Sequence, residues 1–350
     1  MTKLGVIMKK MRLLLFFIFL IFSERLSAAN LDSTLTIPAG LTIYQPTQYA
    51  FSGGNYALGF VALTGGFSVP GSSVVSLGVL QPVSGNINLS TSGGIALTGD
   101  LTLGSNVVIQ NGGTIDGQNH TIFLNGDLTI PANNHFDILS STVIDGQGHD
   151  IIFEDGSYLL LDGSPVGTTL TLRNCILNGV TAGSIEFGSA SNQTLVLNEV
   201  EVHLSGVYTF DGGNLGIQNF VGVTGPGGGI IYNSAYPLTI NSDSTLFLDT
   251  RTTFTYNSPT DSLIVMQDSS SQLFLNGCSF YMPLADQIVL TNGHLIIDHS
   301  TQIYGNGATS PSTNGLYFGN GTPANDLLVD IMPGAIFEVD RTILHYNNSN

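Results

Sequence analysis

The feature that most constrains the fold is a repeat in the first half of the chain. "TIDGQNHTIFL" at 114–124 returns as "VIDGQGHDIIF" at 143–153, and "IALTGDLTL" at 95–103 returns as "IFLNGDLTI" at 122–130. The separation along the chain between the two copies is nearly the same in both repeats. Self-similarity with a period of about 20 to 50 residues is typical of repeat architectures, in which each unit packs against its neighbours.

Each copy alternates apolar and polar residues over short stretches, which are separated by Asn-Gly, Gly-Asp or Asp-Gly turns. Alternation places every second side chain on one face, as in a half-buried strand. The same pattern continues beyond residue 165, for example in "LTLRNCIL" (170–177), "LVLNEVEV" (195–202) and "LFLNGCSFYM" (273–282). No sustained apolar stripe of period 3.6 follows residue 30, so we expect few helices.

These observations predict an all-β parallel solenoid of roughly twelve rungs, each of about 20–30 residues, in which every strand pairs with the same strand of the next rung. A propeller is less favoured because its blades take about 40 residues or more, and a pair of β-sandwiches does not require near-identical neighbouring copies. We expect the solenoid over residues 81–350, with residues 30–80 as an N-terminal cap or the first irregular rungs.

Residues 1–29 have the pattern of a secretory signal peptide. Basic residues precede an uninterrupted apolar run from Leu13 to Phe22, and the small residues Ser27 and Ala29 precede Asn30. This apolar run is too short for a membrane span, which needs roughly 20 residues. We therefore expect a protein that is secreted or attached to the cell surface or outer membrane, with no transmembrane span after cleavage.

The net charge of the chain limits the kinds of partner that it can bind. The chain from Asn30 onward keeps three Arg, no Lys and 24 acidic residues, a net charge of −21 with His neutral. Nucleic acid is not expected as a partner, because phosphate binding relies on Lys and Arg. A glycan or a host or cell-surface protein is compatible with this surface, and carboxylates could attract divalent cations.

The repeat pattern resembles the right-handed parallel β-helix proteins, a group that includes pectin-lyase-like enzymes and bacterial surface adhesins. "IDGQNH" and "IDGQGH" are similar to a turn near the start of the polygalacturonase helix, and "GGI" at 93–95 and "GGGI" at 227–230 are similar to an element of chlamydial-type polymorphic outer-membrane proteins. The resemblance implies a right-handed coil with three sheets.

The motifs that carry catalysis in polygalacturonases (Asn-Thr-Asp, Asp-Asp, Gly-His-Gly and Arg-x-Lys) do not occur in this sequence. Lyases of this fold use a basic residue and Ca²⁺, whereas this chain has no Lys after residue 10. The sequence therefore favours a structural, adhesin-like binding role without catalysis or cofactor. The alternative is a diverged polysaccharide-active enzyme of hydrolase or lyase type.

Four repeated residues are the candidate site: Asp116, Asp145, His120 and His149. If the copies stack, they form an Asp ladder beside a His ladder roughly 4.8 Å apart, a spacing that could hold Ca²⁺ or a softer divalent metal. The simpler interpretation, which we favour, is that Asp-Gly makes the corner, with the Asp side chain bonding the backbone two residues on.

Two further expectations concern single features. Cys175 and Cys278 lie about four rungs apart, too far for a disulfide, so we expect buried free thiols. The last residues show no polar cap, and an open rung invites edge pairing. A homo-oligomer, a C-terminal partner and a truncated gene remain alternatives.

Overall fold

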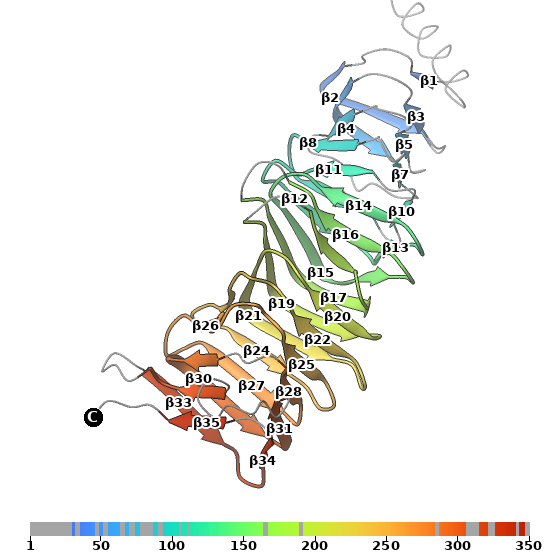
Figure 1. Ribbon diagram of the computed structural model, residues 1–350. Helices are drawn as coiled ribbons and strands as arrows, with labels where there is room; N and C mark the ends of the chain where they lie inside the picture. Colours follow the sequence, from blue (N-terminus) through green and yellow to red (C-terminus); the bar gives the residue numbers. More distant parts are fainter. Residues whose placement is uncertain are drawn as a thin grey trace, which may run out of the picture.

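A computed structural model gives the fold. It describes side chains for residues 94–340, apart from 105–107, 109–112, 164–166, 189–191, 284–287, 306–314 and 321–325. For the strands between Asn30 and Leu89 and for the strand Ile343–Tyr346 it describes the backbone alone, and the predicted signal peptide lies outside the described residues. Short parallel strands stack into one elongated rod, shown from blue to red in Figure 1.

From residue 94 onward the strands of a rung lie on the three sides of a triangle, and the strands of each side stack in parallel from rung to rung. The described strands before residue 94 lie on two of these sides. We call the sides 1, 2 and 3 in chain order. Side 1 contains β9 (Leu101–Leu103), β12 (Thr121–Leu124), the first halves of β15 (Thr142–Phe153), β17 (Thr169–Val180), β19 (Thr194–Leu204) and β21 (Asn214–Thr224), then β23 (Leu238–Ile240) and β26 (Ile264–Met266), followed by β29 (Gln287–Leu290), β32 (Gly315–Phe318) and β35 (Ile343–Tyr346).

Side 2 follows around the first corner. It contains β1 (Asn30–Leu31), β3 (Tyr49–Phe51), β5 (Phe67–Val69), β7 (Ile87–Leu89), β10 (Val107–Gln110), β13 (Leu128–Ile130), the second halves of β15, β17, β19 and β21, then β24 (Thr245–Leu248), β27 (Gln272–Asn276), β30 (Asn292–Asp298) and β33 (Asp326–Ile331).

Side 3 closes the triangle as a sheet of eight strands followed by a sheet of six. Tyr208 Oη donates to the Ile185 carbonyl oxygen at 3.1 Å where the two sheets meet. The strands are β2 (Thr36–Gln45), β4 (Asn55–Leu63), β6 (Val74–Leu77), β8 (Gly94–Leu97), β11 (Thr114–Asp116), β14 (His135–Ile138), β16 (Tyr158–Leu161) and β18 (Ile185–Phe187), then β20 (Val207–Phe210), β22 (Gly229–Tyr232), β25 (Thr253–Tyr256), β28 (Ser279–Met282), β31 (Ser300–Gly305) and β34 (Ile336–Asp340).

The predicted all-β parallel solenoid is confirmed. On side 1, from β9 to β26, every step between paired residues falls within the expected rung length; the shortest runs from Leu197 to Ile217 and the longest from Ile144 to Leu172. Inward residues form continuous apolar columns. One column consists of Leu101, Ile122, Ile144, Leu172, Leu197, Ile217, Ile240 and Met266, all buried. Burying each such side chain contributes about 1.5–3 kcal/mol, so the stack of columns is the source of stability.

The corner between sides 1 and 2 contains one residue with a left-handed backbone in each of three successive rungs. Asn174, Glu199 and Asn219 each have φ between 50° and 56°, in the left-handed region, and they divide β17, β19 and β21. Asn adopts this region more readily than most residues because its side chain bonds locally. Across this corner β17 and β19 keep one register. Between β19 and β21 the register shifts at the corner, where Phe220 is an additional residue of β21.

Candidate binding surface

The predicted ladder of Asp116 with Asp145 is not formed, which corrects the expectation that the repeat copies stack. Asp116 lies on side 3 and pairs with Ala96, whereas Asp145 lies on side 1 and pairs with Phe123. Strands β11, β12, β13 and β14 begin at residues 114, 121, 128 and 135. The chain therefore passes from one side to the next at short, regular steps. The repeat from residue 114 to residue 143 spans one full rung and one further side, so its two copies lie on different sides.

His120 and His149 do not stack on each other either. Instead each lies against an Asp of the preceding rung, with Nδ1 of His120 3.7 Å from Asp100 Oδ1 and Nδ1 of His149 3.8 Å from Asp127 Oδ1. The same Asp oxygens accept backbone amides from Thr121 at 2.9 Å and from Asp150 at 3.1 Å. The two corners therefore share one arrangement, in which an Asp of the preceding rung contacts a His and accepts a backbone amide, but they lie at different corners of the triangle.

The two predicted Asp residues act locally. Asp145 Oδ1 accepts the amide of Gln147 at 3.1 Å, which is the expected turn contact two residues on, and Asp145 Oδ2 accepts Arg173 Nε at 2.8 Å. Asp116 accepts the Ser140 hydroxyl at 2.5 Å and the Gln118 side-chain amide at 3.1 Å. Within the described residues, no three His, Cys, Asp or Glu side chains gather as a metal site.

An aromatic row on the outside of side 2 is a feature that the sequence analysis missed. Phe247 pairs with Phe274 in the next rung, and their ring centroids are 5.0 Å apart. Phe220 is 45% exposed, and its ring centroid lies 6.0 Å from that of Phe247. A Cβ on Gly222 would lie 3.1 Å from the Phe220 ring, so the ring covers this glycine. Ile296 follows Phe274 in register and extends the row.

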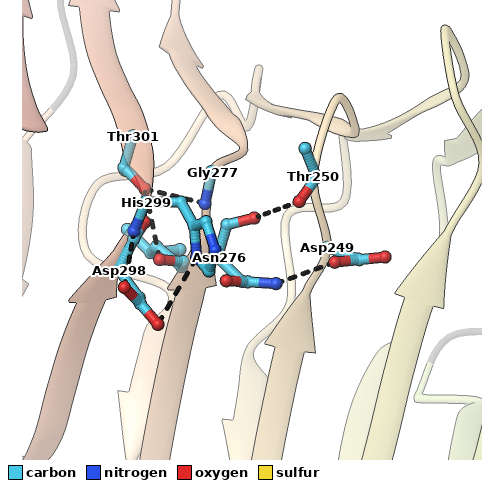
Figure 2. Close-up of polar contacts among 8 residues, drawn as sticks. Asp249, Thr250, Asn276, Gly277, Asp298, His299 and Thr301 are labelled. Carbon is cyan, nitrogen blue, oxygen red and sulfur yellow. Dashed lines mark hydrogen bonds and ion pairs between the residues drawn. The ribbon is translucent and has the colours of Figure 1, made fainter. Parts of the chain in front are cut away.

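Polar residues, drawn in Figure 2, follow the row in each rung, two residues further along the chain, and we call them the polar corner. Because side chains two residues apart share one face of a strand, Asp249, Asn276 and Asp298 border Phe247, Phe274 and Ile296. The Asn276 side-chain amide donates to Asp249 Oδ1 at 2.8 Å, and Asn276 pairs with Asp298 in the next rung.

The hydrogen bonds of this corner hold its shape. The His299 amide donates to Asp298 Oδ1 at 2.7 Å, and the Thr250 hydroxyl donates to the Asn276 carbonyl oxygen at 3.3 Å. Thr301 Oγ1 accepts the Gly277 amide at 3.1 Å. The His299 side chain is 64% exposed. The outside of side 2 therefore combines an apolar strip with fixed carboxylate and amide groups.

The interior of the described rungs is filled by apolar side chains. One space between the three sides has about 40 Å³ and is lined by core residues such as Leu177, Tyr208 and Phe254. Ligand pockets usually have about 300–1,000 Å³, so this space is too small for a sugar. The buried free thiols expected at Cys175 and Cys278 are confirmed.

Comparisons with protein-family models, with characterised proteins and with solved structures find no match. The strand pairing is therefore what defines the chain as a parallel β-solenoid. No helix among the described residues is long and apolar enough to cross a bilayer.

Proposed function

We propose that this protein is a secreted or cell-surface β-solenoid with a structural, adhesin-like role and no catalysis. We further propose that the outside of side 2 binds a neutral glycan. The observation that carries the proposal is the row of Phe220, Phe247 and Phe274 beside the polar corner.

The chemistry of this surface suits a sugar polymer. The C–H faces of sugar rings pack on aromatic side chains, which bring a large apolar area with little loss of side-chain freedom. Sugar hydroxyls donate well to carboxylates, and Asp249 and Asp298 present such acceptors along the same edge. Because the rungs repeat, an extended polymer meets the same groups more than once.

Charge favours a neutral polymer over an acidic one. The whole chain has a net charge of −17, and an anionic glycan would meet like charge at Asp249 and Asp298. The aromatic contacts also stabilise the sheet, by about 0.2–1 kcal/mol for each cross-strand pair. Loss of a ring should therefore weaken binding without unfolding the rod.

The test is retention of residues 30–350 on immobilised cellulose, mannan and starch, with polygalacturonate as the acidic polymer, with and without Ca²⁺. We expect retention on at least one neutral polymer, and at least about tenfold weaker binding by the double variant Phe247→Ala/Phe274→Ala. Val265→Ala is the matched control, because Val265 is 41% exposed on side 1, away from the aromatic row.

Three results would overturn the proposal. New reducing ends or unsaturated products would show catalysis and would support the polysaccharide-active alternative. Retention on polygalacturonate alone would contradict the choice of a neutral polymer. Retention on none of these polymers, with a folded protein by circular dichroism, would remove the glycan and favour a protein partner.

A further inference from the structure

Two tyrosines on the outside of side 3 lie in contact across neighbouring rungs. Tyr281 of β28 pairs in register with Tyr304 of β31. Their ring centroids are 4.5 Å apart and their ring planes differ by 17°, so the two phenols are stacked. Paired residues on neighbouring parallel strands lie about 4.8 Å apart. The pairing of β28 with β31 therefore holds the two rings against each other.

The pair lies on a face that solvent reaches. Both side chains are half-buried. In the same column of outward residues Thr255 precedes Tyr281, and Asp340 follows Tyr304. The neighbours of the pair in this column are therefore polar, and solvent reaches the two phenols as one unit.

A second tyrosine pair shows what distinguishes this one. Tyr232 and Tyr256 also pair in register, on β22 and β25, but both are 0% exposed. Their ring centroids are 6.2 Å apart, and the Tyr256 hydroxyl donates to the Thr260 carbonyl oxygen at 2.6 Å. The core pair is shielded from reagents in solution, whereas Tyr281 and Tyr304 are both closer together and accessible.

The cysteines do not link two rungs of this chain covalently. Cys175 and Cys278 are its only two cysteines, and both are free and buried. Two phenols in contact offer another route, because phenoxyl radicals couple through a carbon–carbon bond between their ortho positions. We propose that Tyr281 and Tyr304 are the site of a dityrosine cross-link, formed by a peroxidase that uses hydrogen peroxide.

The coupling needs no group of the protein besides the two phenols. The peroxidase removes one electron and one proton from each phenol, and the two phenoxyl radicals join at one Cε atom of each ring. The hydrogens on those two carbons then move to the phenol oxygens, which restores both aromatic rings. One hydrogen peroxide is reduced to two waters, and the protein loses two hydrogen atoms.

The environment of the pair fits this step. Burial raises the pKa of the Tyr304 phenol, and the neighbouring Tyr281 adds to the rise. At neutral pH the Tyr304 phenol is therefore protonated, and it loses its proton together with the electron.

The cross-link would join two rungs that are otherwise held by hydrogen bonds and packing. A covalent link between distant residues stabilises a fold mainly by restricting the unfolded chain, so we expect the cross-linked protein to unfold at a higher urea concentration than the untreated protein. The tyrosine pair lies on side 3 and the aromatic row on side 2. Retention on glycans should not change, and either proposal can fail alone.

The experiment is treatment of residues 30–350 with hydrogen peroxide and a haem peroxidase, followed by dityrosine fluorescence and mass spectrometry of the monomer and its peptides. We expect a monomer lighter by two hydrogen atoms, in which the peptide with Tyr281 is joined to the peptide with Tyr304. Tyr281→Phe and Tyr304→Phe each keep the stacked ring but lack one phenol, so neither should form this product.

Tyr158→Phe is the matched control. Tyr158 is also half-buried on side 3, but it stacks on His135, with ring centroids 4.6 Å apart, so this variant should cross-link like the parent. Treatment in urea, where the strands separate, should abolish the specific product. A folded parent that gains no such bond, a bond that persists in Tyr281→Phe, equal formation in urea, or cross-links found only between copies would contradict the proposal.

Discussion

The imidazole of His120 lies 3.7 Å from the carboxylate of Asp100, one rung away, and that carboxylate also accepts the Thr121 amide at 2.9 Å. Asp100→Ala removes the acceptor for this amide and should lower the free energy of unfolding by about 0.5–1.5 kcal/mol. Asp100→Asn keeps an oxygen acceptor and should stay close to the parent in urea unfolding.

The pair His149 and Asp127 repeats this arrangement at another corner, so Asp127→Ala and Asp127→Asn should reproduce the difference. If the Asn variants are as unstable as the Ala variants, the ion pair with His rather than the amide contact stabilises the corner. An exposed ion pair of this kind contributes at most about 1 kcal/mol.

Arg173 stabilises a largely buried carboxylate. Its Nε donates to Asp145 Oδ2 at 2.8 Å, and the Asp145 side chain is 9% exposed. Arg173→Leu should lower the free energy of unfolding by about 1–3 kcal/mol, because the carboxylate loses a charged donor. Adding Asp145→Asn should recover part of this loss. Arg251→Leu at an exposed turn is the control, and an equal effect there would contradict the explanation.

The two cysteines should be inert in the folded protein. Burial raises the pKa of the Cys175 thiol to about 12, and burial likewise raises the pKa of the Cys278 thiol to about 12. Since the thiolate is the reactive form, a thiol-specific reagent at neutral pH should modify neither residue until urea unfolds the chain, and then both. Modification of the native protein would place a thiol at the surface.

Asp137 should make stability depend on pH. Burial raises the pKa of this carboxyl above its ordinary value of 3.8, His135 opposes the rise and Asp162 adds to it. The folded state then holds the proton more tightly than the unfolded state. This group therefore lowers the free energy of unfolding as pH rises from below 3.8 through the raised pKa.

Asp137→Asn removes that dependence. Relative to the parent, the variant should become more stable as pH rises through this interval, in urea unfolding at a series of pH values. Asp155→Asn, at an exposed turn, controls for the loss of one negative charge. A difference between Asp137→Asn and the parent that does not change with pH would contradict the expected shift.

Much of the fold could be predicted from alternation and repetition. Leu-x-Leu and Ile-x-Leu stretches with Gly, Asn or Asp at the turns predict strands at 101–103, 122–124, 170–172 and 195–197, and all four are observed. Burial at alternate positions follows directly, as in the buried pair Leu170 and Leu172. The buried free cysteines were also predictable, because their separation in the stack excludes a disulfide.

The register between rungs was not predictable from the repeat. Ile122 resembles Ile95 in its local sequence, yet it pairs with Leu101. All three sides use the same apolar alternation and the same turn residues, so local sequence does not distinguish one side from the next. The Asp and His ladder was inferred from that similarity, and it fails for this reason.

The aromatic row had a sequence signal that alternation alone did not reveal. "TLFLD" at 245–249 returns as "QLFLN" at 272–276, with Phe between two Leu. Phe in such a strand usually suggests a core position. It points outward here because Leu246 and Leu248, on either side of Phe247, occupy the inward positions.

By itself the sequence determined a stack of short parallel strands, because alternating apolar residues with turn residues at the corners can be buried only by neighbouring copies. The tertiary structure decided which copies are neighbours, since a rung closes where three sides of varying length meet. The rung from Ile144 to Leu172 is longer than the rung from Leu197 to Ile217, and each absorbs a register shift, between Asp145 and His149 in β15 and between Asn198 and Val200 in β19. That closure places Phe247 on Phe274 and Asp249 beside Asn276, and so it creates the surface proposed to bind.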